Sequence, residues 1–332
     1  MSEPNSDIEA VRTAAEQGDA EAQFLLGVCL SSGFGCQPNL QEALRWYRAA
    51  AEAGNSRAQF NLAQSLFEGD GCEQDIEEAL RWFRASAEQG DPKGAFALAQ
   101  HLFEGEGCEA DKPEAIRWFR LAAEKGIDLA QLRLGLCLLD GDGCPEDKTE
   151  ALKWITAAAR QGCLNAQASL AFCLATGNGC QPDEREAFRW YRAAAEGGLY
   201  VAQSALGYCL SQGLGCEKAP AEAVKWYRLA AEQGDPFSQS ELGKALLRGI
   251  GCRKDPAEAA RWLYRAAEQG NAAAQYELGK CFARGVGCDQ DIEKGKFWFN
   301  KANQQGNKKA RDRLFELMAT GSIGEDDPAL DW

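Results

Sequence analysis

Tryptophan recurs at a fixed spacing of 36 residues through most of this 332-residue chain. Eight of the nine tryptophans belong to the series, which runs from Trp46 to Trp298, and only Trp332 lies outside it. Cysteine keeps the same step from Cys36 to Cys288. Self-similarity at a period of about 20 to 50 residues is typical of solenoids and repeat arrays. The chain is therefore predicted to contain eight copies of one structural unit around a continuous core.

Within one copy, residues 55–90 predict two helices joined by a glycine-rich turn. The first helix has small and apolar residues four positions apart, from Ala58 to Leu66, which gives it one apolar face. The second helix has apolar residues at helical spacing on both sides of Trp82, and this pattern predicts that the tryptophan is buried in the core.

Capping residues set the predicted ends of these helices. Asp or Asn stands before most of the first helices, and Asn55 is an example. Three starts lack such a residue and are expected to be less sharply capped: Ile127, Cys163 and Leu199. Before the second helix, Asp75 and Glu78 form an Asp-x-x-Glu capping box. We also expect Glu78 to pair with Arg81 on the solvent side of the same helix.

The two ends of the chain depart from the period as capping units do. Residues 1–18 predict an N-terminal capping helix, because residues 6–17 are similar to a second helix without its tryptophan. Eight repeats then occupy residues 19–306. Residues 307–320 predict a C-terminal capping helix, and residues 321–332 form an acidic tail. The predicted fold is an all-α solenoid of eight helix–turn–helix repeats.

Composition excludes several classes of protein. A formal net charge of −14 argues against a nucleic-acid partner, because phosphate contacts need a basic surface. No apolar run is long enough to span a bilayer, so no membrane partner is expected. The first residues contain neither a basic nor an apolar segment, which favours a cytoplasmic protein, with export by another route left open.

The repeated unit resembles the Sel1-like repeat, a 36-residue relative of the tetratricopeptide repeat. The residues that carry the resemblance in the first unit, and recur in the others, are Ala22, Leu26, Gly27, Gly33, Gly35, Ala43, Trp46, Tyr47, Ala50 and Ala51. The resemblance implies a right-handed superhelix of paired helices. It also implies an adaptor that holds a protein or peptide on its concave surface and carries out no chemistry.

Cysteine is where this chain departs from that family. Each unit has a cysteine after the Gly-x-Gly turn, where the family usually has an aliphatic residue, so the disulfide pattern of cysteine-rich relatives cannot be transferred. Five units have a second cysteine seven residues earlier: Cys29/Cys36, Cys137/Cys144, Cys173/Cys180, Cys209/Cys216 and Cys281/Cys288. These pairs would form disulfides if oxidised. We favour reduced cysteines that act as small buried hydrophobic residues, and expect Cys163 to be the most exposed thiol.

The sequence contains no motif that indicates catalysis. Ser-x-x-Lys, Gly-x-Ser-x-Gly, a Walker A loop and His-Glu-x-x-His are all absent. The one histidine, His101, replaces a core-side cysteine and is expected to be a tolerated core residue, so we expect no metal and no cofactor. Two alternatives to a non-catalytic scaffold remain. One is a redox-responsive or cofactor-binding module built on the cysteines, and the other is a β-lactam-type hydrolase, as proposed for some cysteine-rich relatives.

A row of variable residues on the first helices is the candidate partner surface, because in helical-repeat solenoids these helices line the inner face. The candidate residues are Phe24, Phe60, Phe67, Phe96, Phe103, Leu132, Phe172, Tyr208, Lys244, Arg248, Tyr276, Lys280 and Arg284. The row is aromatic with an acidic rim in its first half and basic in its second half. It predicts a partner with an apolar segment and an acidic segment. The alternative is that the phenylalanines pack between neighbouring first helices.

The tail, residues 321–332, suggests a further partner. It carries several carboxylates and ends in Trp332. We expect that its carboxylates could meet the basic residues of the row, in the same chain or in a second copy, which would cause self-association. The alternative is an ordinary chain end.

Overall fold

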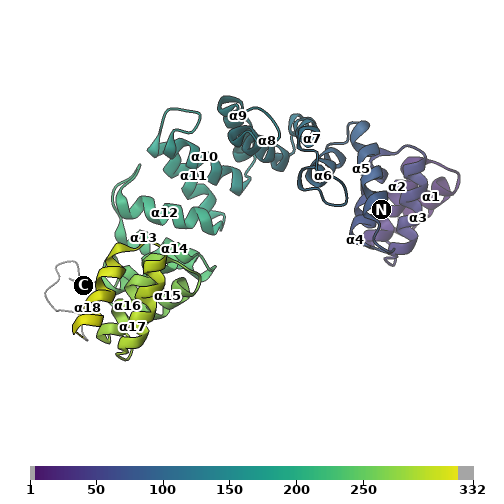
Figure 1. Ribbon diagram of the computed structural model, residues 1–332. Helices are drawn as coiled ribbons and strands as arrows, with labels where there is room; N and C mark the ends of the chain where they lie inside the picture. Colours follow the sequence, from purple (N-terminus) through teal and green to yellow (C-terminus); the bar gives the residue numbers. More distant parts are fainter. Residues whose placement is uncertain (1–3, 321–332) are drawn as a thin grey trace. The chain divides into compact units, whose positions relative to one another are not determined.

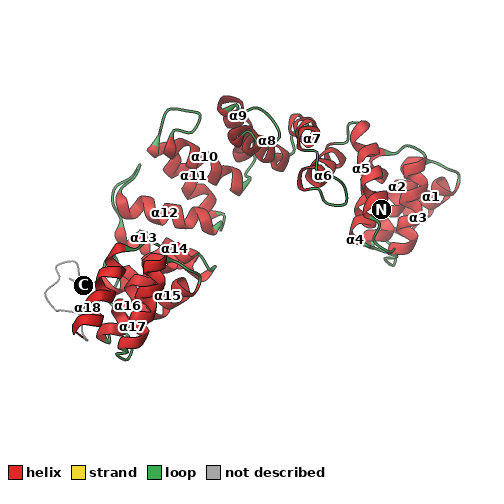
Figure 2. Cartoon of the chain, in the orientation of Figure 1, coloured by secondary structure: helices red, strands yellow, loops and turns green. Residues whose placement is uncertain are grey.

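The computed structural model describes residues 4–320, which form eighteen α-helices joined by short turns (Figures 1 and 2). No strand occurs between residues 4 and 320. The helices are α1 Pro4–Glu16, α2 Ala20–Ser32, α3 Leu40–Glu52, α4 Ser56–Glu68, α5 Ile76–Glu88, α6 Pro92–Glu104, α7 Lys112–Glu124, α8 Asp128–Asp140, α9 Lys148–Arg160, α10 Leu164–Thr176, α11 Glu184–Glu196, α12 Tyr200–Gln212, α13 Pro220–Glu232, α14 Pro236–Arg248, α15 Pro256–Glu268, α16 Ala272–Arg284, α17 Ile292–Gln304 and α18 Lys308–Thr320.

The helices alternate between two roles. The even-numbered helices from α2 to α16 are the first helices of the repeats, and the odd-numbered helices from α3 to α17 are the second helices. A first helix packs most extensively on the second helix that follows it, and also on the second helix that precedes it. Within each unit, successive helices thus pack on their neighbours in sequence, which is the arrangement of a solenoid. The predicted all-α solenoid is confirmed.

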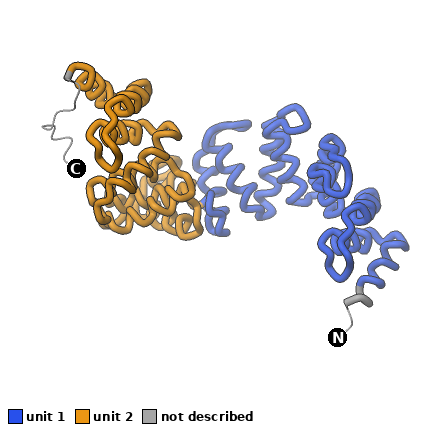
Figure 3. Tube along the Cα trace, turned by 90° about the horizontal axis from the view of Figure 1, so that it is seen from below, with its two compact units in different colours: residues 1–166 blue, residues 167–332 orange. Residues whose placement is uncertain are grey.

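Two compact units divide the chain, residues 1–166 and residues 167–332, called unit 1 and unit 2 below (Figure 3). Helices α1 to α9 belong to unit 1, helices α11 to α18 belong to unit 2, and α10 crosses the boundary. None of the helices in the described part of the chain is long and apolar enough to cross a membrane. The acidic tail, residues 321–332, lies outside the described residues.

The predicted caps are present at the starts of the first helices. Asn55 accepts a hydrogen bond from the backbone N–H of Ala58 at 3.0 Å, and α4 begins there. The starts of α8 and α12, after Ile127 and Leu199, have no side-chain cap, as predicted. Asp75 caps α5 through the N–H of Glu78 at 2.8 Å.

The predicted pair of Glu78 with Arg81 is replaced by a contact between repeats. The Glu78 carboxylate binds Arg48 of the preceding second helix and accepts a hydrogen bond from Trp82 Nε1 at 3.2 Å. The same ion pair joins Arg12 to Glu42, Arg84 to Glu114, Arg120 to Glu150, Arg192 to Glu222 and Arg228 to Glu258. These carboxylates therefore tie successive odd-numbered helices together within each unit, beginning with α1 and α3.

The repeated tryptophan lies at the edge of the core, and the prediction that it is fully inside was wrong for most copies. Only Trp262 and Trp298 are buried, and the other six in the series are half-buried. The indole N–H needs a hydrogen-bond acceptor. In the copies from Trp82 to Trp262, a glutamate four residues earlier in the same helix supplies it, as Glu114 does for Trp118. The next residue along the helix fills the core instead, as Phe83 and Phe119 do with 1% of their surface exposed.

Candidate partner-binding surface

A cavity of about 470 Å³ opens among the first helices of unit 1. Helices α4, α6 and α8 supply most of its lining, and the second helices α5 and α7 each supply one phenylalanine. The lining residues are Gln64, Phe67, Phe83, Ala97, Gln100, His101, Phe103, Glu104, Glu106, Phe119, Arg133, Leu136, Cys137, Asp140 and Asp142. We call this cavity the unit 1 pocket.

Aromatic rings form the apolar part of the unit 1 pocket. The His101 ring lies 4.5 Å from the ring of Phe67 and 5.6 Å from that of Phe83, measured between centroids. On the other side, the rings of Phe103 and Phe119 are 6.0 Å apart. Phe83 and Phe119 are core residues, whereas Phe67 and Phe103 are half-buried. The cavity therefore has aromatic walls that are continuous with the core of the repeats.

The turn after α6 places a carboxylate beside the histidine. Gly105 ends α6 with a φ of 73°, in the left-handed region, and its N–H donates to the His101 carbonyl at 2.8 Å. At Gly107, whose φ is 77°, a Cβ atom would lie 2.2 Å from Ile76 Cγ2, so glycine alone fits against α5. Glu106 stands between the two glycines, and its Oε2 lies 3.4 Å from His101 Nδ1.

Carboxylates dominate the polar part of the unit 1 pocket. Glu104 and Asp140 are the last residues of α6 and α8, and Glu106 and Asp142 come from the turns that follow. Arg133 is the one arginine or lysine among the lining residues. The local charge is therefore negative, in addition to the net charge of −14 of the whole chain.

One of these carboxylates already has a cationic partner in the chain. Lys112 Nζ lies 2.8 Å from Asp142 Oδ1, and the same nitrogen lies 4.8 Å from the centroid of the Phe103 ring. The lysine thus contacts both a rim carboxylate and an aromatic wall of the unit 1 pocket. This contact is a cation–π interaction of the kind that an ammonium group makes with a ring face.

Burial controls the charge of the histidine in the unit 1 pocket. His101 has 8% of its surface exposed, and burial lowers the pKa of its imidazole, with Glu106 opposing part of that shift. An imidazole with a lowered pKa is mainly neutral at pH 7. It therefore does not cancel the negative charge of the rim at that pH.

In unit 1, the predicted row divides into two sets. Residues at the position of Phe24 pack on the second helix of the same repeat: the ring of Phe60 lies 5.9 Å from that of Phe83, and Phe96 lies 5.9 Å from Phe119. Phe24 and Leu132 are buried, and Phe60 and Phe96 are half-buried. Of the row in this unit, Phe67 and Phe103 line the pocket.

In unit 2, the aromatic members of the row differ in exposure. Phe172 on α10 and Tyr208 on α12 are exposed, with 56% and 45% of their surface accessible. The Tyr208 ring lies 6.2 Å from that of Phe237, edge to face. Tyr276 is buried, and its ring lies 5.8 Å from that of Phe299.

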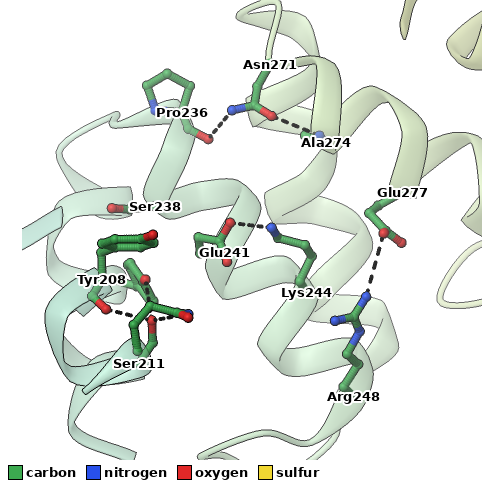
Figure 4. Close-up of polar contacts among 12 residues, drawn as sticks. Tyr208, Ser211, Pro236, Ser238, Glu241, Lys244, Arg248, Asn271, Ala274 and Glu277 are labelled. Atoms are coloured by element: carbon green, nitrogen blue, oxygen red, sulfur yellow. Dashed lines mark hydrogen bonds and ion pairs between the residues drawn. The ribbon is translucent and has the colours of Figure 1, made fainter. Parts of the chain in front are cut away.

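Three basic members of the row have acidic neighbours, on the same helix or on the next first helix (Figure 4). Lys244 pairs with Glu241 on α14, and Arg248 Nη2 lies 3.9 Å from Glu277 Oε1. Lys280 has only 1% of its surface exposed, and its Nζ lies 2.9 Å from Glu277 Oε2. Much of the positive charge expected along this row is therefore neutralised locally. Arg284, the last residue of α16, is half-buried.

Sequence reasoning missed several members of these sites. It did not single out the middle residue of the Gly-x-Gly turn, which is acidic only in three consecutive units, as Asp70, Glu106 and Asp142. That cluster was a signal for an acidic rim. It also overlooked Glu241 and Glu277, whose spacing of three residues from a lysine on the same helix predicts an ion pair.

The fourteen cysteines are free thiols in this structure. Cys137, Cys173 and Cys209 are buried, and burial raises the pKa of each thiol to about 11. Cys163 is also buried, with 8% of its surface exposed, so the expectation that it is the most exposed thiol was wrong. Within residues 4–320, no group of three or more His, Cys, Asp or Glu side chains could hold a metal ion.

Several solved structures are similar to this chain. The protein c5321, a protective antigen present in uropathogenic Escherichia coli strains displaying an SLR fold, is 32% identical, and its TM-score is 0.87 over 95% of this chain and 68% of that chain. A Sel1 repeat protein from Oxalobacter formigenes is 33% identical, with a TM-score of 0.69 over 95% of this chain and 93% of its own. No curated protein matches the chain significantly.

The family comparison agrees with the period of the sequence and with the helix pairs. The Sel1 repeat model matches residues 20–55, 56–91, 92–127, 128–163, 164–199, 201–235, 236–271 and 272–307. These matches cover most of the chain, and each spans one first helix and one second helix. The chain therefore belongs to the Sel1 repeat family.

Proposed function

We propose that this protein is a non-catalytic scaffold that binds a segment of a partner protein in the unit 1 pocket. Repeat solenoids of the Sel1 and tetratricopeptide type generally mediate protein–protein interactions, and the Sel1 repeat is generally a non-catalytic fold. Fold alone does not locate a binding site. The location rests on the pocket itself, because it combines half-buried aromatic rings with a rim in which carboxylates outnumber cationic side chains.

The observation that carries the proposal is the position of Phe67 and Phe103. Both rings belong to the candidate row, and both are half-buried walls of a cavity of about 470 Å³. This volume falls within the range of about 300 to 1,000 Å³ that is usual for ligand sites. Aromatic side chains are also common among the residues that dominate binding energy at interfaces.

A peptide selection tests the proposal. A random dodecapeptide library is selected on the whole chain, and binding of the enriched peptides is then measured for variants. Phe67→Ala with Phe103→Ala should weaken binding at least about tenfold, because it removes both walls. Gln100→Trp should weaken it as well, by filling the pocket without removing either ring.

The matched control is Phe34→Ala with Phe297→Ala, which removes two exposed rings outside the pocket, 74% and 52% accessible. This control should bind like the wild type. Circular dichroism melting curves identify any variant that fails to fold. The proposal is contradicted if no peptide is enriched, or if the control loses binding while the folded pocket variants keep it.

A further inference from the structure

We propose that the unit 1 pocket recognises a lysine or arginine side chain presented on an apolar segment of the partner. This inference rests on the proposed function and specifies the chemistry of the same site. It follows from three separate features of the pocket: the balance of charge at its rim, the ring faces at its walls and an unsatisfied polar atom at its base.

The first feature is the charge at the rim. Lys112 compensates Asp142, with 2.8 Å between the charged atoms. Glu104, Glu106 and Asp140 remain, against Arg133 as the cation among the lining residues. Opposite charge placed in a cleft attracts a ligand more strongly than the same charge on an open surface, because the walls restrict solvent. A cationic side chain would therefore be favoured here over a neutral or acidic one.

The second feature is the set of ring faces. The contact of Lys112 with Phe103 demonstrates that a ring of this pocket can take an ammonium group on its face, at 4.8 Å. The pocket contains three further phenylalanine rings, among them Phe67, which is half-buried. The alkyl part of a lysine or arginine side chain would pack against such rings while its charged end reaches the carboxylates.

The third feature is His101. Only 8% of its surface is exposed, and its Nδ1 atom makes no hydrogen bond, with Glu106 Oε2 the nearby carboxylate oxygen at 3.4 Å. Buried polar atoms without a hydrogen bond are rare and need an explanation. A donor group from a bound guanidinium or ammonium would provide the missing partner for a neutral imidazole.

The contrasting cavity in unit 2 supports this assignment. It has a volume of about 240 Å³, and its lining includes Lys244, Arg248 and Glu241. Lys244 and Glu241, three residues apart on α14, form an ion pair with each other, so their charges cancel. The unit 1 pocket differs because most of its carboxylates have no such neighbour among the lining residues.

Three fluorescein-labelled nonapeptides test the inference, with fluorescence anisotropy as the readout. They share one neutral sequence and differ only in the three central residues: Leu-Arg-Leu, Leu-Gln-Leu or Leu-Glu-Leu. The arginine peptide should bind at least about tenfold more tightly than the glutamine peptide, and the glutamate peptide should bind most weakly. Glu104→Gln with Asp140→Asn should lower the affinity for the arginine peptide about tenfold and leave that for the glutamine peptide unchanged.

The matched control is Glu88→Gln with Glu124→Gln, which removes two exposed carboxylates of unit 1 that do not line the pocket. It changes the net charge equally and should leave all affinities unchanged. The inference is overturned if the three peptides bind equally, if the control lowers affinity as much as the rim variant, or if the arginine peptide does not bind at about 1 mM.

The outcomes separate this inference from the proposed function. If Phe67→Ala with Phe103→Ala abolishes binding of the peptides while the rim variant does not, the pocket is the binding site but does not select a cation. If a library-selected peptide also binds the variant with Phe67→Ala and Phe103→Ala as tightly as it binds the wild type, the proposed function fails together with the inference.

Discussion

Lys280 and Glu277 form an ion pair in the interior of unit 2, with 2.9 Å between Nζ and Oε2. Only 1% of the lysine surface and 6% of the glutamate surface are exposed. Burial lowers the pKa of Lys280, and Glu277 opposes that shift. The Lys280 Nζ also lies 5.2 Å from the centroid of the Tyr276 ring. Tyr276, Glu277 and Lys280 are thus buried residues of α16 in the interior of unit 2, and they do not form an open basic surface.

Removing one member of this pair should destabilise the protein strongly. Lys280→Ala leaves the Glu277 carboxylate buried without its main partner, which costs about 3 kcal/mol in the free energy of unfolding. Replacing both, as Lys280→Met with Glu277→Leu, should return stability to within about 1 kcal/mol of the wild type. Urea unfolding of the single and double variants measures the difference. A Lys280→Ala variant with the wild-type midpoint would show that the pair is not buried as described.

A small-residue pair between α5 and α6 gives a second prediction. Gly94 stands where most repeats have alanine, and Ser86 stands where most others also have alanine. A Cβ atom at Gly94 would lie 2.4 Å from Ser86 Oγ, which itself donates to the Ser56 carbonyl at 2.9 Å. Gly94→Ala alone should therefore destabilise by about 1 to 3 kcal/mol through overpacking. Adding Ser86→Ala should recover most of this loss, which thermal melts measure. Equal melting midpoints for the single variant Gly94→Ala and the double variant would contradict this explanation.

The ion pairs between second helices predict a loss of stability in acid. The hydrogen bond from Arg48 lowers the pKa of Glu78, and that from Arg84 lowers the pKa of Glu114. A carboxyl with a lower pKa in the folded state stabilises the protein above its unfolded pKa of about 4.3, and this contribution is lost as the pH falls through the folded pKa.

The free energy of unfolding should therefore fall between pH 6 and pH 3. Glu78→Gln with Glu114→Gln should reduce that fall by about 0.5 to 1 kcal/mol for each pair, since the arginines are about 40% exposed and solvent screens them. Denaturant titrations at several pH values provide the measurement. If the free energy of unfolding fell equally with pH in the wild type and the variant, these carboxylates would have ordinary pKa values.

Thiol reactivity tests the redox alternative. Cys281 is fully buried with its pKa raised to about 12, and Cys173 is 1% exposed with its pKa raised to about 11. Neither should react with Ellman's reagent at pH 8 in the native state, because the thiolate is the reactive form. The half-buried turn cysteines, such as Cys72 and Cys108, should react first. Fewer than fourteen thiols in denaturant without reductant would favour disulfides instead.

The period of 36 residues was sufficient to predict the helices, their caps and the solenoid. It could not predict which partner each polar side chain takes in the neighbouring repeat. Glu78 illustrates this limit: spacing within one helix favoured Arg81, but stacking of the repeats brings Arg48 closer. A single unit contains no information about such contacts, because they depend on how far one second helix is displaced from the next.

The sequence predicted the unit 1 pocket only in part, for a similar reason. Phe67 and Phe103 were found because they vary along the row, whereas Phe83 and Phe119 were seen only as core residues. His101 was expected to be an inert core substitution. The cavity beside it arises where side chains from three successive first helices meet two second helices, which no single repeat specifies.

Photo-cross-linking tests the central claim most directly. p-Benzoylphenylalanine is placed at Glu68, an exposed residue that follows the pocket residue Phe67 on α4, or at Leu229, an exposed residue on α13 in unit 2. Each protein is irradiated with a library-selected peptide, and the cross-linked peptide is located by mass spectrometry. We expect a cross-link from position 68 and none from position 229. Cross-linking from position 229 alone, or equally from both, would contradict a partner site in the unit 1 pocket.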